Sequence, residues 1–184
     1  MFTHKWYVDF TPKIQNTDEA TPKQELLNVL FGKIHGILVS HPNLIALLPM
    51  LSTPGNKKRI VGLRIFAENK ENVNKLVELI NTNFLQDYFD PINIKEVNSY
   101  KGLLVCRRFR IPHDHKFLDL KKKKYEEASK KPFFNRKSKS NGHFIRVYFD
   151  VIEWGTESPK PHQGEVDSWG MSLKASPCIL PDVK

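Results

Sequence analysis

Hydrophobic and polar positions along the chain follow two different periods. Residues 5–11 place Trp6, Val8 and Phe10 on one side, which is the two-residue period of a half-buried strand. Residues 24–40 place apolar side chains three and four positions apart, which predicts a helix that starts at a capping box in residues 21–24 and ends before Pro42. The apolar stripe of this helix consists of Leu27, Leu30, Phe31, Ile34 and Leu38.

The spacing of apolar and turn-forming residues also predicts the next elements of the chain. Two apolar runs, residues 44–51 and 59–67, are separated by turn-forming residues and predict two strands. Asn69 can cap a second helix that extends to about residue 82, and residues 92–97 predict a closing strand. The order strand, helix, strand, strand, helix, strand predicts an α+β, ferredoxin-like domain over residues 1–98, an arrangement that RNA-recognition modules share. Many unrelated activities use this fold, so it does not decide function.

The composition changes after residue 98. Residues 99–111 predict a strand with three arginines, residues 120–131 a short basic helix, and residues 133–142 a polar loop. Residues 143–153 predict a strand with Ile145, Val147, Phe149 and Val151 on its buried face and Phe144, Arg146 and Tyr148 on its open face. Interleaved aromatic and basic side chains suit stacking on bases and neutralisation of phosphates, although an ordinary half-exposed strand can show the same pattern. We expect residues 99–184 to form a smaller, basic α/β domain that binds RNA.

The positive charge of the chain is confined to one block. Of the 184 residues, 29 are Lys or Arg and 20 are Asp or Glu, which gives a net charge of +9. Residues 95–146 hold 16 Lys and Arg against 5 Asp and Glu, a net charge of +11, and the remainder holds 13 against 15, a net charge of −2. A block of one sign favours a polyanionic partner, most simply a nucleic acid, over a solvated face of mixed charge.

Several other classes of protein lack support in the sequence. No run approaches the roughly 20 apolar residues of a membrane span, and the N-terminus is charged where a signal peptide would be apolar. Cys106 and Cys178 stand alone, and His113 and His115 have no companion ligand, so neither a disulfide framework nor a zinc site is indicated. No G-x-S-x-G motif supports acyl transfer. We expect a cytoplasmic protein without a metal ion, a cofactor or a membrane partner.

His35 is the residue of the first helix that does not fit its pattern. It interrupts the edge of the apolar stripe, and Gly32 and Gly36 lie on either side of it, although glycine costs a helix interior roughly 1 kcal/mol relative to alanine. A histidine at such an edge is more often a half-buried structural residue than a catalyst. The flanking glycines are also what a close approach of a ligand backbone would require.

Three local sequences resemble one known family. The helix sequence LNVLFGKIHGILVS closely resembles the signature helix of the repeat-processing endoribonuclease of type I-F CRISPR systems. RKSKSNGHFIRVYF is similar to the Ser-x-Ser-x-Gly stretch of that family with its following His-Phe and strand, and SWGMSLK is similar to its aromatic-Gly-hydrophobic-Ser motif. The three motifs occur in the order and at the distances of the family, so the resemblance covers almost the whole chain.

The resemblance implies a role for individual residues. His35 corresponds to the catalytic histidine, and Ser138 to the catalytic serine, with Ser140 as its neighbour in the same loop; which of the two serines acts is left open. The implied RNA-binding residues are Arg107, Arg108, Arg110, Lys121, Lys122, Lys123, Lys124, Phe144, Arg146 and Trp169. Among them, Phe144 would stack on the base of the RNA hairpin, Arg108 and Arg110 would read base edges, and the lysines would lie in the major groove.

The chain departs from the family at three of these positions. Trp169 stands where the family usually has tyrosine, so any role of a phenol hydroxyl is lost. The groove helix is rich in lysine rather than arginine, and lysine neutralises phosphate without the bidentate contact to guanine. Arg110 stands where glutamine is common. We infer that the RNA is still a hairpin and that its sequence differs.

The expected function is therefore metal-independent cleavage of the repeat hairpin of precursor CRISPR RNA. The 2′-hydroxyl beside the scissile phosphate would attack it, giving 2′,3′-cyclic phosphate ends, and a histidine has the acid–base range to assist near neutral pH. The resemblance also implies that the protein stays bound to its product within the type I-F surveillance complex, together with other protein subunits. Two alternatives remain open: a non-catalytic RNA-hairpin-binding subunit, and a purely structural subunit of a ribonucleoprotein.

Overall fold

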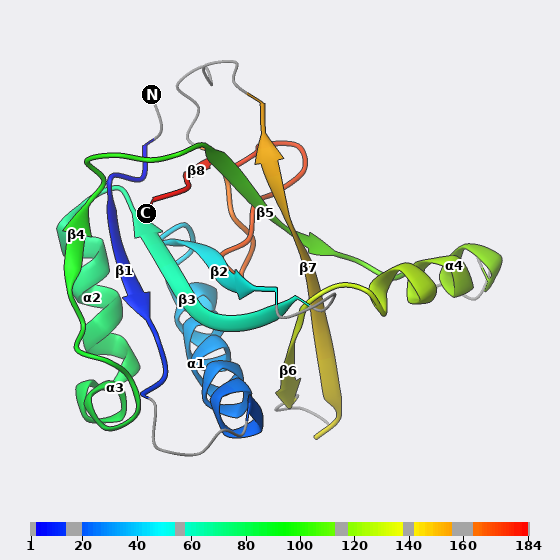
Figure 1. Cartoon of the computed structure of the whole chain (residues 1–184), viewed down its shortest axis with the longest axis horizontal. Coiled ribbons are helices and arrows are strands. Elements are labelled where there is room, and N and C mark those ends of the chain that lie inside the picture. Colours follow the sequence, from blue (N-terminus) through cyan, green and yellow to red (C-terminus); the bar gives the residue numbers. More distant parts are fainter. Residues whose placement is uncertain are drawn as a thin grey trace.

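The described part of the chain forms two sheets with helices packed on them. The structure, a computed structural model, describes residues 3–13, 20–53, 58–112, 118–137, 142–155 and 164–183 (Figure 1). Within these residues the fold is α+β, with two four-stranded antiparallel sheets and four helices. The elements are β1 (Trp6–Phe10), α1 (Ala20–Ser40), β2 (Ala46–Ser52), β3 (Arg59–Ala67), α2 (Lys70–Ile80), α3 (Thr82–Tyr88), β4 (Ile94–Glu96), β5 (Leu103–Phe109), α4 (Leu118–Ala128), β6 (Phe133–Lys137), β7 (Phe144–Trp154) and β8 (Leu180–Pro181).

The first sheet has the strand order β2-β3-β1-β4. Together with the crossover helices α1 and α2, this order is compatible with the ferredoxin-like arrangement that the element order predicts. The predicted strands and the two predicted helices are confirmed to within a few residues. The short helix α3 was not predicted; the side chain of Asn81 caps it by accepting from the backbone N–H groups of Asn83 and Phe84.

The core explains why the first half of the chain could be predicted well. All five residues of the α1 stripe are buried, and they pack in one apolar cluster with Val8 and Phe10 of β1. On α2, Val73 and Leu76 are buried in the same cluster. Because burial of these periodic side chains is what drives a helix onto a sheet, their spacing alone is sufficient to place the elements.

The second sheet has the order β6-β7-β5-β8 and corrects two predictions. Residues 133–137 of the predicted polar loop form the edge strand β6, whose Phe134 is completely buried. Ile145 was predicted to be buried and is 42 % exposed, because the first residues of β7 extend with β6 beyond the core (Figure 1). Val147 and Phe149 are buried as predicted.

The face of the first sheet opposite its helices is covered by the second half of the chain. Tyr7 and Phe66, neighbours on this face, are both buried. Arg64 forks onto the carboxylate of Asp9, with N–O distances of 2.6 and 2.8 Å, and also donates to the carbonyl oxygen of Val183 at 2.7 Å. This face is therefore closed to the base stacking that RNA-recognition modules perform there. The division at residue 98 stays a prediction.

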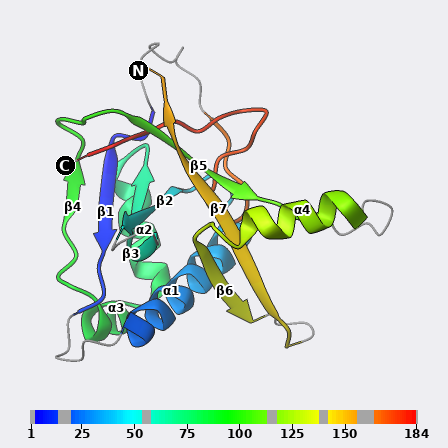
Figure 2. The same cartoon turned by 45° about the vertical axis from the view of Figure 1, so that its right-hand side comes forward.

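Helix α4 is the element with the fewest neighbours in the fold. In both views it extends away from the two sheets (Figures 1 and 2). Lys122 and Lys123 are exposed, whereas Lys124 pairs with Glu127 at 2.9 Å and lies over the ring of Phe109. None of the helices in the described residues has the length and apolar character needed to cross a membrane.

Candidate active site

His35 lies against Trp169, a residue 134 positions away in the sequence. The two rings are stacked, with a centroid distance of 3.7 Å and an interplanar angle of 15°. Phe31, one turn earlier on α1, also stacks on Trp169, at 5.2 Å. Phe31 in turn stacks on the buried ring of Phe134 in β6. The imidazole of His35 is therefore held at the end of a continuous row of aromatic rings that joins both halves of the chain.

The segment that carries Trp169 is a tight turn fixed by Asp167. The carboxylate of Asp167 accepts hydrogen bonds from the backbone N–H groups of Trp169 and Met171, at 2.9 and 3.1 Å. Gly170 has a φ of +73°, and a Cβ there would lie 3.0 Å from Cβ of Leu47. The carbonyl of Gly170 accepts from the N–H of Leu47 in β2 at 2.7 Å. Only glycine fits this left-handed position without strain, so the turn is docked on β2 in one geometry.

This turn presents a backbone carbonyl to His35. Nδ1 of His35 lies 2.6 Å from the carbonyl oxygen of Ser168. Since a carbonyl can only accept, Nδ1 must carry the proton, and the neutral ring then has its lone pair on Nε2. No described residue makes a hydrogen bond to Nε2. The arrangement leaves one nitrogen of the ring available to take a proton.

Two arginines surround the same pair of rings. The guanidinium carbons of Arg108 on β5 and Arg136 on β6 lie 5.4 and 5.0 Å from the centre of the Trp169 ring. Burial lowers the pKa of His35; the Ser168 carbonyl and Asp167 oppose this effect, and Arg136 and Arg108 add to it. The pKa of Arg108 is also lowered, first by burial and then by the nearby charge of Arg110. The site therefore combines a neutral imidazole with a concentration of positive charge that suits a phosphate.

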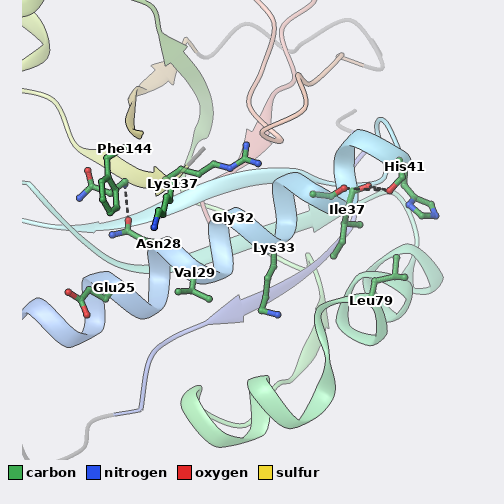
Figure 3. A pocket seen from close by; sticks show the side chains of 14 residues that line it. Glu25, Asn28, Val29, Gly32, Lys33, Ile37, His41, Leu79, Lys137 and Phe144 are labelled. Carbon is green, nitrogen blue, oxygen red and sulfur yellow. Dashed lines mark hydrogen bonds between the residues drawn. The ribbon is translucent and has the colours of Figure 1, made fainter. Parts of the chain in front are cut away.

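A groove runs along the outer face of α1 beside this site, and we call it the helix groove. Its volume is about 770 Å³, and Figure 3 shows that it extends from Glu25 to His41 along the helix. Gly32 and Gly36 line it, and a Cβ built on either glycine would meet no atom of the described residues within 4 Å. Its other lining residues are Asn28, Val29, Lys33, Ile37, Ser40, Leu79, Asn135, Arg136, Lys137 and Phe144. The glycines therefore keep the surface of the helix open next to His35, rather than making room for a neighbouring protein segment.

The structure places the other residues predicted for the site as follows. Phe144 is 76 % exposed at one end of the helix groove, and Arg110 is exposed. Arg146 is exposed and lies over the ring of Phe133, 5.0 Å from its centre. Nε of Arg107 is buried and has no hydrogen-bond partner among the described residues. Trp169 is only 7 % exposed, and His35 and Phe31 already stack on it. Its contact with RNA stays a prediction, and its observed contact is with His35.

The remaining predicted residues lie outside the described part of the chain. These are Ser138 and Ser140 of the predicted catalytic loop, and the pair His113 and His115. Across the described ranges, no group of three or more His, Cys, Asp and Glu side chains is placed to hold a metal ion. The thiols of Cys106 and Cys178 are buried, and burial raises the pKa of the Cys178 thiol to about 12, so both are poor nucleophiles.

Sequence reasoning missed three groups that define this site. Ser168 contributes only its backbone carbonyl, which leaves no signal in the sequence. Asp167 could have been suspected, because Asp followed three residues later by Gly is a common turn pattern. Arg136 was assigned to a loop, and only the pairing of β6 with β7 directs its side chain toward Trp169.

Comparisons with known proteins do not assign the chain to a family. No protein-family model matches it, and no curated protein matches it. One solved structure, of a candidate chlorite dismutase, TA0507, is similar over 79 % of both chains with 11 % sequence identity and a TM-score of 0.32. A similarity at this level supports no conclusion about fold or function.

Proposed function

We propose that this protein is a metal-independent endoribonuclease that cleaves the repeat hairpin of precursor CRISPR RNA by attack of an RNA 2′-hydroxyl. The observation that supports this proposal best is the geometry of His35. Its Nδ1–H is committed to the Ser168 carbonyl, and no described residue occupies Nε2. A neutral imidazole held in this way can accept the proton of a 2′-hydroxyl as its oxygen attacks phosphorus, a contribution worth roughly 10²–10⁴ in rate. The bond from phosphorus to the 5′-oxygen then breaks, and water or the protonated imidazole supplies the proton of the 5′-hydroxyl end.

Stacking on Trp169 adds a positional contribution. The ring of His35 is held by a stacked partner and by one hydrogen bond, so little rotation is left to it. A pre-oriented base lowers the entropic part of the barrier, because the reacting atoms do not have to find one another. Trp169 thus takes the role of a positioning residue, with no need for the phenol hydroxyl of the tyrosine that is common in the family.

The positive charge around His35 fits the phosphate at which the RNA would be cut. Arg108 and Arg136 approach the Trp169 ring from two different strands, and Arg110 lies close enough to Arg108 to affect its pKa. Guanidinium groups form paired hydrogen bonds with phosphate oxygens and stabilise the charge that develops on them during attack. Ser138 or Ser140 would then orient the 2′-hydroxyl.

The proposal extends to the partners of the protein. The exposed lysines Lys122 and Lys123 on the projecting helix α4 would neutralise the phosphates of the RNA stem, and the exposed Phe144 would stack on the base of the stem. After cleavage, the protein would remain on its product hairpin and join the other subunits of a type I-F surveillance complex.

The test uses the repeat hairpin encoded beside the gene, incubated with the protein in excess EDTA. We expect cleavage that leaves 2′,3′-cyclic phosphate and 5′-hydroxyl ends, loss of cleavage in His35→Ala, and hairpin affinity within a few-fold of the wild-type value in that variant. A mobility shift without any cleavage by the wild-type protein would instead establish the non-catalytic binding subunit. A strict requirement for Mg²⁺ would contradict the proposed mechanism.

A further inference from the structure

A second groove lies where α1, the start of β3 and the connection from α4 to β6 meet, and we call it the basic groove. Its volume is about 690 Å³. The residues that line it are Gln24, Lys58, Arg59, Ile60, Ser129, Lys130, Lys131, Pro132, Phe133 and Asn135. Neither the sequence motifs nor the proposed catalytic site accounts for it.

The described lining residues of the basic groove carry charge of one sign. Four of them are Lys or Arg, and none is Asp or Glu. Lys131 is neutralised by Asp150 at 2.7 Å and by Glu127 at 3.4 Å. Lys58, Arg59 and Lys130 are exposed, and no carboxylate of the described residues pairs with them. Three cations without a carboxylate partner among the described residues therefore face one groove.

These cations come from distant parts of the sequence. Arg59 is the first residue of β3 and Lys58 directly precedes it, whereas Lys130 follows α4 in the second half of the chain. One aromatic side chain, Phe133, is among the described lining residues; it packs against Tyr148 in a T-shaped contact, and Arg146 lies over its ring. A positive groove with an aromatic side chain in its wall is the combination with which proteins bind single-stranded nucleic acids.

The basic groove borders the helix groove that runs past His35. The side chain of Asn28 accepts from Nε2 of Gln24 at 3.3 Å and from the backbone N–H of Asn135 at 3.0 Å. Gln24 and Asn135 line the basic groove, and Asn28 and Asn135 line the helix groove. His35 lies seven residues beyond Asn28, or roughly 10 Å along the helix axis. A strand that leaves the cleavage site along α1 would therefore reach the basic groove within a short distance.

We propose that the basic groove binds the phosphate backbone of the single-stranded RNA that flanks the hairpin. The proposal rests on the proposed function for the identity of the RNA. The groove adds affinity that depends on the flank and not on the stem, which α4 contacts. Lys58, Arg59 and Lys130 make the phosphate contacts, and Phe133 provides the wall against which the flank packs.

The experiment compares two triple variants that remove the same charge. The groove variant, Lys58→Ala/Arg59→Ala/Lys130→Ala, removes the three exposed cations that line the basic groove. The control variant, Lys5→Ala/Lys75→Ala/Lys101→Ala, removes three exposed lysines from other parts of the chain. Affinities are measured at several salt concentrations for the hairpin alone, for the hairpin with a 5′ or a 3′ single-stranded flank, and for an oligouridylate without a hairpin. Thermal unfolding checks that both variants are folded.

We expect the groove variant to bind one of the flanked hairpins and the oligouridylate about tenfold or more weakly. The slope of log K against log salt concentration should become smaller in magnitude by about 2, because each phosphate contact to a single strand contributes roughly 0.7 to that slope. Binding of the bare hairpin should stay within about twofold, and the control variant should bind all RNAs nearly as the wild type does. Equal losses in the two variants, or equal losses for the bare and flanked hairpins, would overturn the proposal. If the wild-type protein cleaves the hairpin and the flanks do not change its affinity, the proposal for the basic groove fails and the proposed function stands. If oligouridylate binding depends on the groove but the hairpin is not recognised, only the proposed function fails.

Discussion

The glycine next to His35 provides a test in which stability and activity should change in opposite directions. Gly36 is exposed on α1 and lines the helix groove, and a Cβ on it would meet no atom within 4 Å in the described part of the chain. Gly36→Ala should therefore stabilise the folded protein by about 0.5–1 kcal/mol, because alanine loses less backbone entropy in a helix. For a protein of this size that corresponds to a rise in Tm of roughly 1–4 °C.

The same methyl group should slow cleavage. If the RNA backbone passes over Gly36, the added carbon occupies space that the RNA needs, and overpacking of this kind costs roughly 1–3 kcal/mol. That range corresponds to a rate lower by about 5- to 150-fold. We would measure single-turnover cleavage of the flanked hairpin together with thermal unfolding.

Asn74→Ala serves as the matched control for Gly36→Ala. Asn74 is an exposed position of α2, does not line the helix groove, and also gains helix propensity on replacement by alanine. It should raise stability slightly and leave the cleavage rate unchanged. A Gly36→Ala protein that is more stable and fully active would refute the idea that the glycine is retained for RNA, and a less stable one would refute the description of the helix surface.

Three further predictions concern the candidate site and the basic helix. Burial, Arg136 and Arg108 lower the pKa of His35, and a general base is active only above its pKa. Single-turnover cleavage rates should therefore fall as the pH falls, with a midpoint below about 6.5. A rate that declines above neutrality would assign His35 as an acid. Trp169→Ala should lower the free energy of unfolding by roughly 3–5 kcal/mol and remove most of the cleavage rate. Trp169→Phe keeps a ring under His35 and should keep most of the cleavage rate. Equal cleavage rates in the two folded variants would exclude the positioning role. Alanine replacement of residues 121–124 should weaken binding to matched and mismatched hairpins alike and reduce the dependence of affinity on salt. Arg110→Ala should lower the binding free energy by about 1–3 kcal/mol for the matched stem only. Binding assays with the two stems distinguish these cases, and the reverse result would exchange the two roles.

The sequence predicts the first half of the fold because its signals are local. The stripe of α1 repeats every three or four residues, and each of its members is buried in the structure. Strand β6 has no such signal, because Asn135, Arg136 and Lys137 are polar and only Phe134 is buried. Its extended conformation comes from pairing with β7, a contact that is not encoded within the segment itself.

The candidate site divides in the same way. His35 is conspicuous in the sequence because it breaks an apolar stripe between two glycines, but its assignment as the catalytic residue comes from the family resemblance. Its hydrogen-bond partner could not be selected, because the Ser168 carbonyl belongs to the backbone and lies 133 residues away. Trp169 was predicted as a site residue from a local motif, and the structure adds that it packs under His35.

The electrostatics of the site relate its two chemical tasks to each other. Burial lowers the pKa of His35 most, and the arginines that would hold the phosphate lower it further, so the charges that would attract the substrate also favour the neutral imidazole. A bound phosphate would offset part of that positive charge and raise the pKa of His35 toward its ordinary value, which makes the imidazole a stronger base only once RNA is present. The Ser168 carbonyl preserves the tautomer through this change, because it accepts from Nδ1 whether or not Nε2 is protonated. If the proposed mechanism holds, a single histidine can serve as the titrating group, because the proton that Nε2 takes from the 2′-hydroxyl can be returned to the 5′-oxygen as that oxygen leaves.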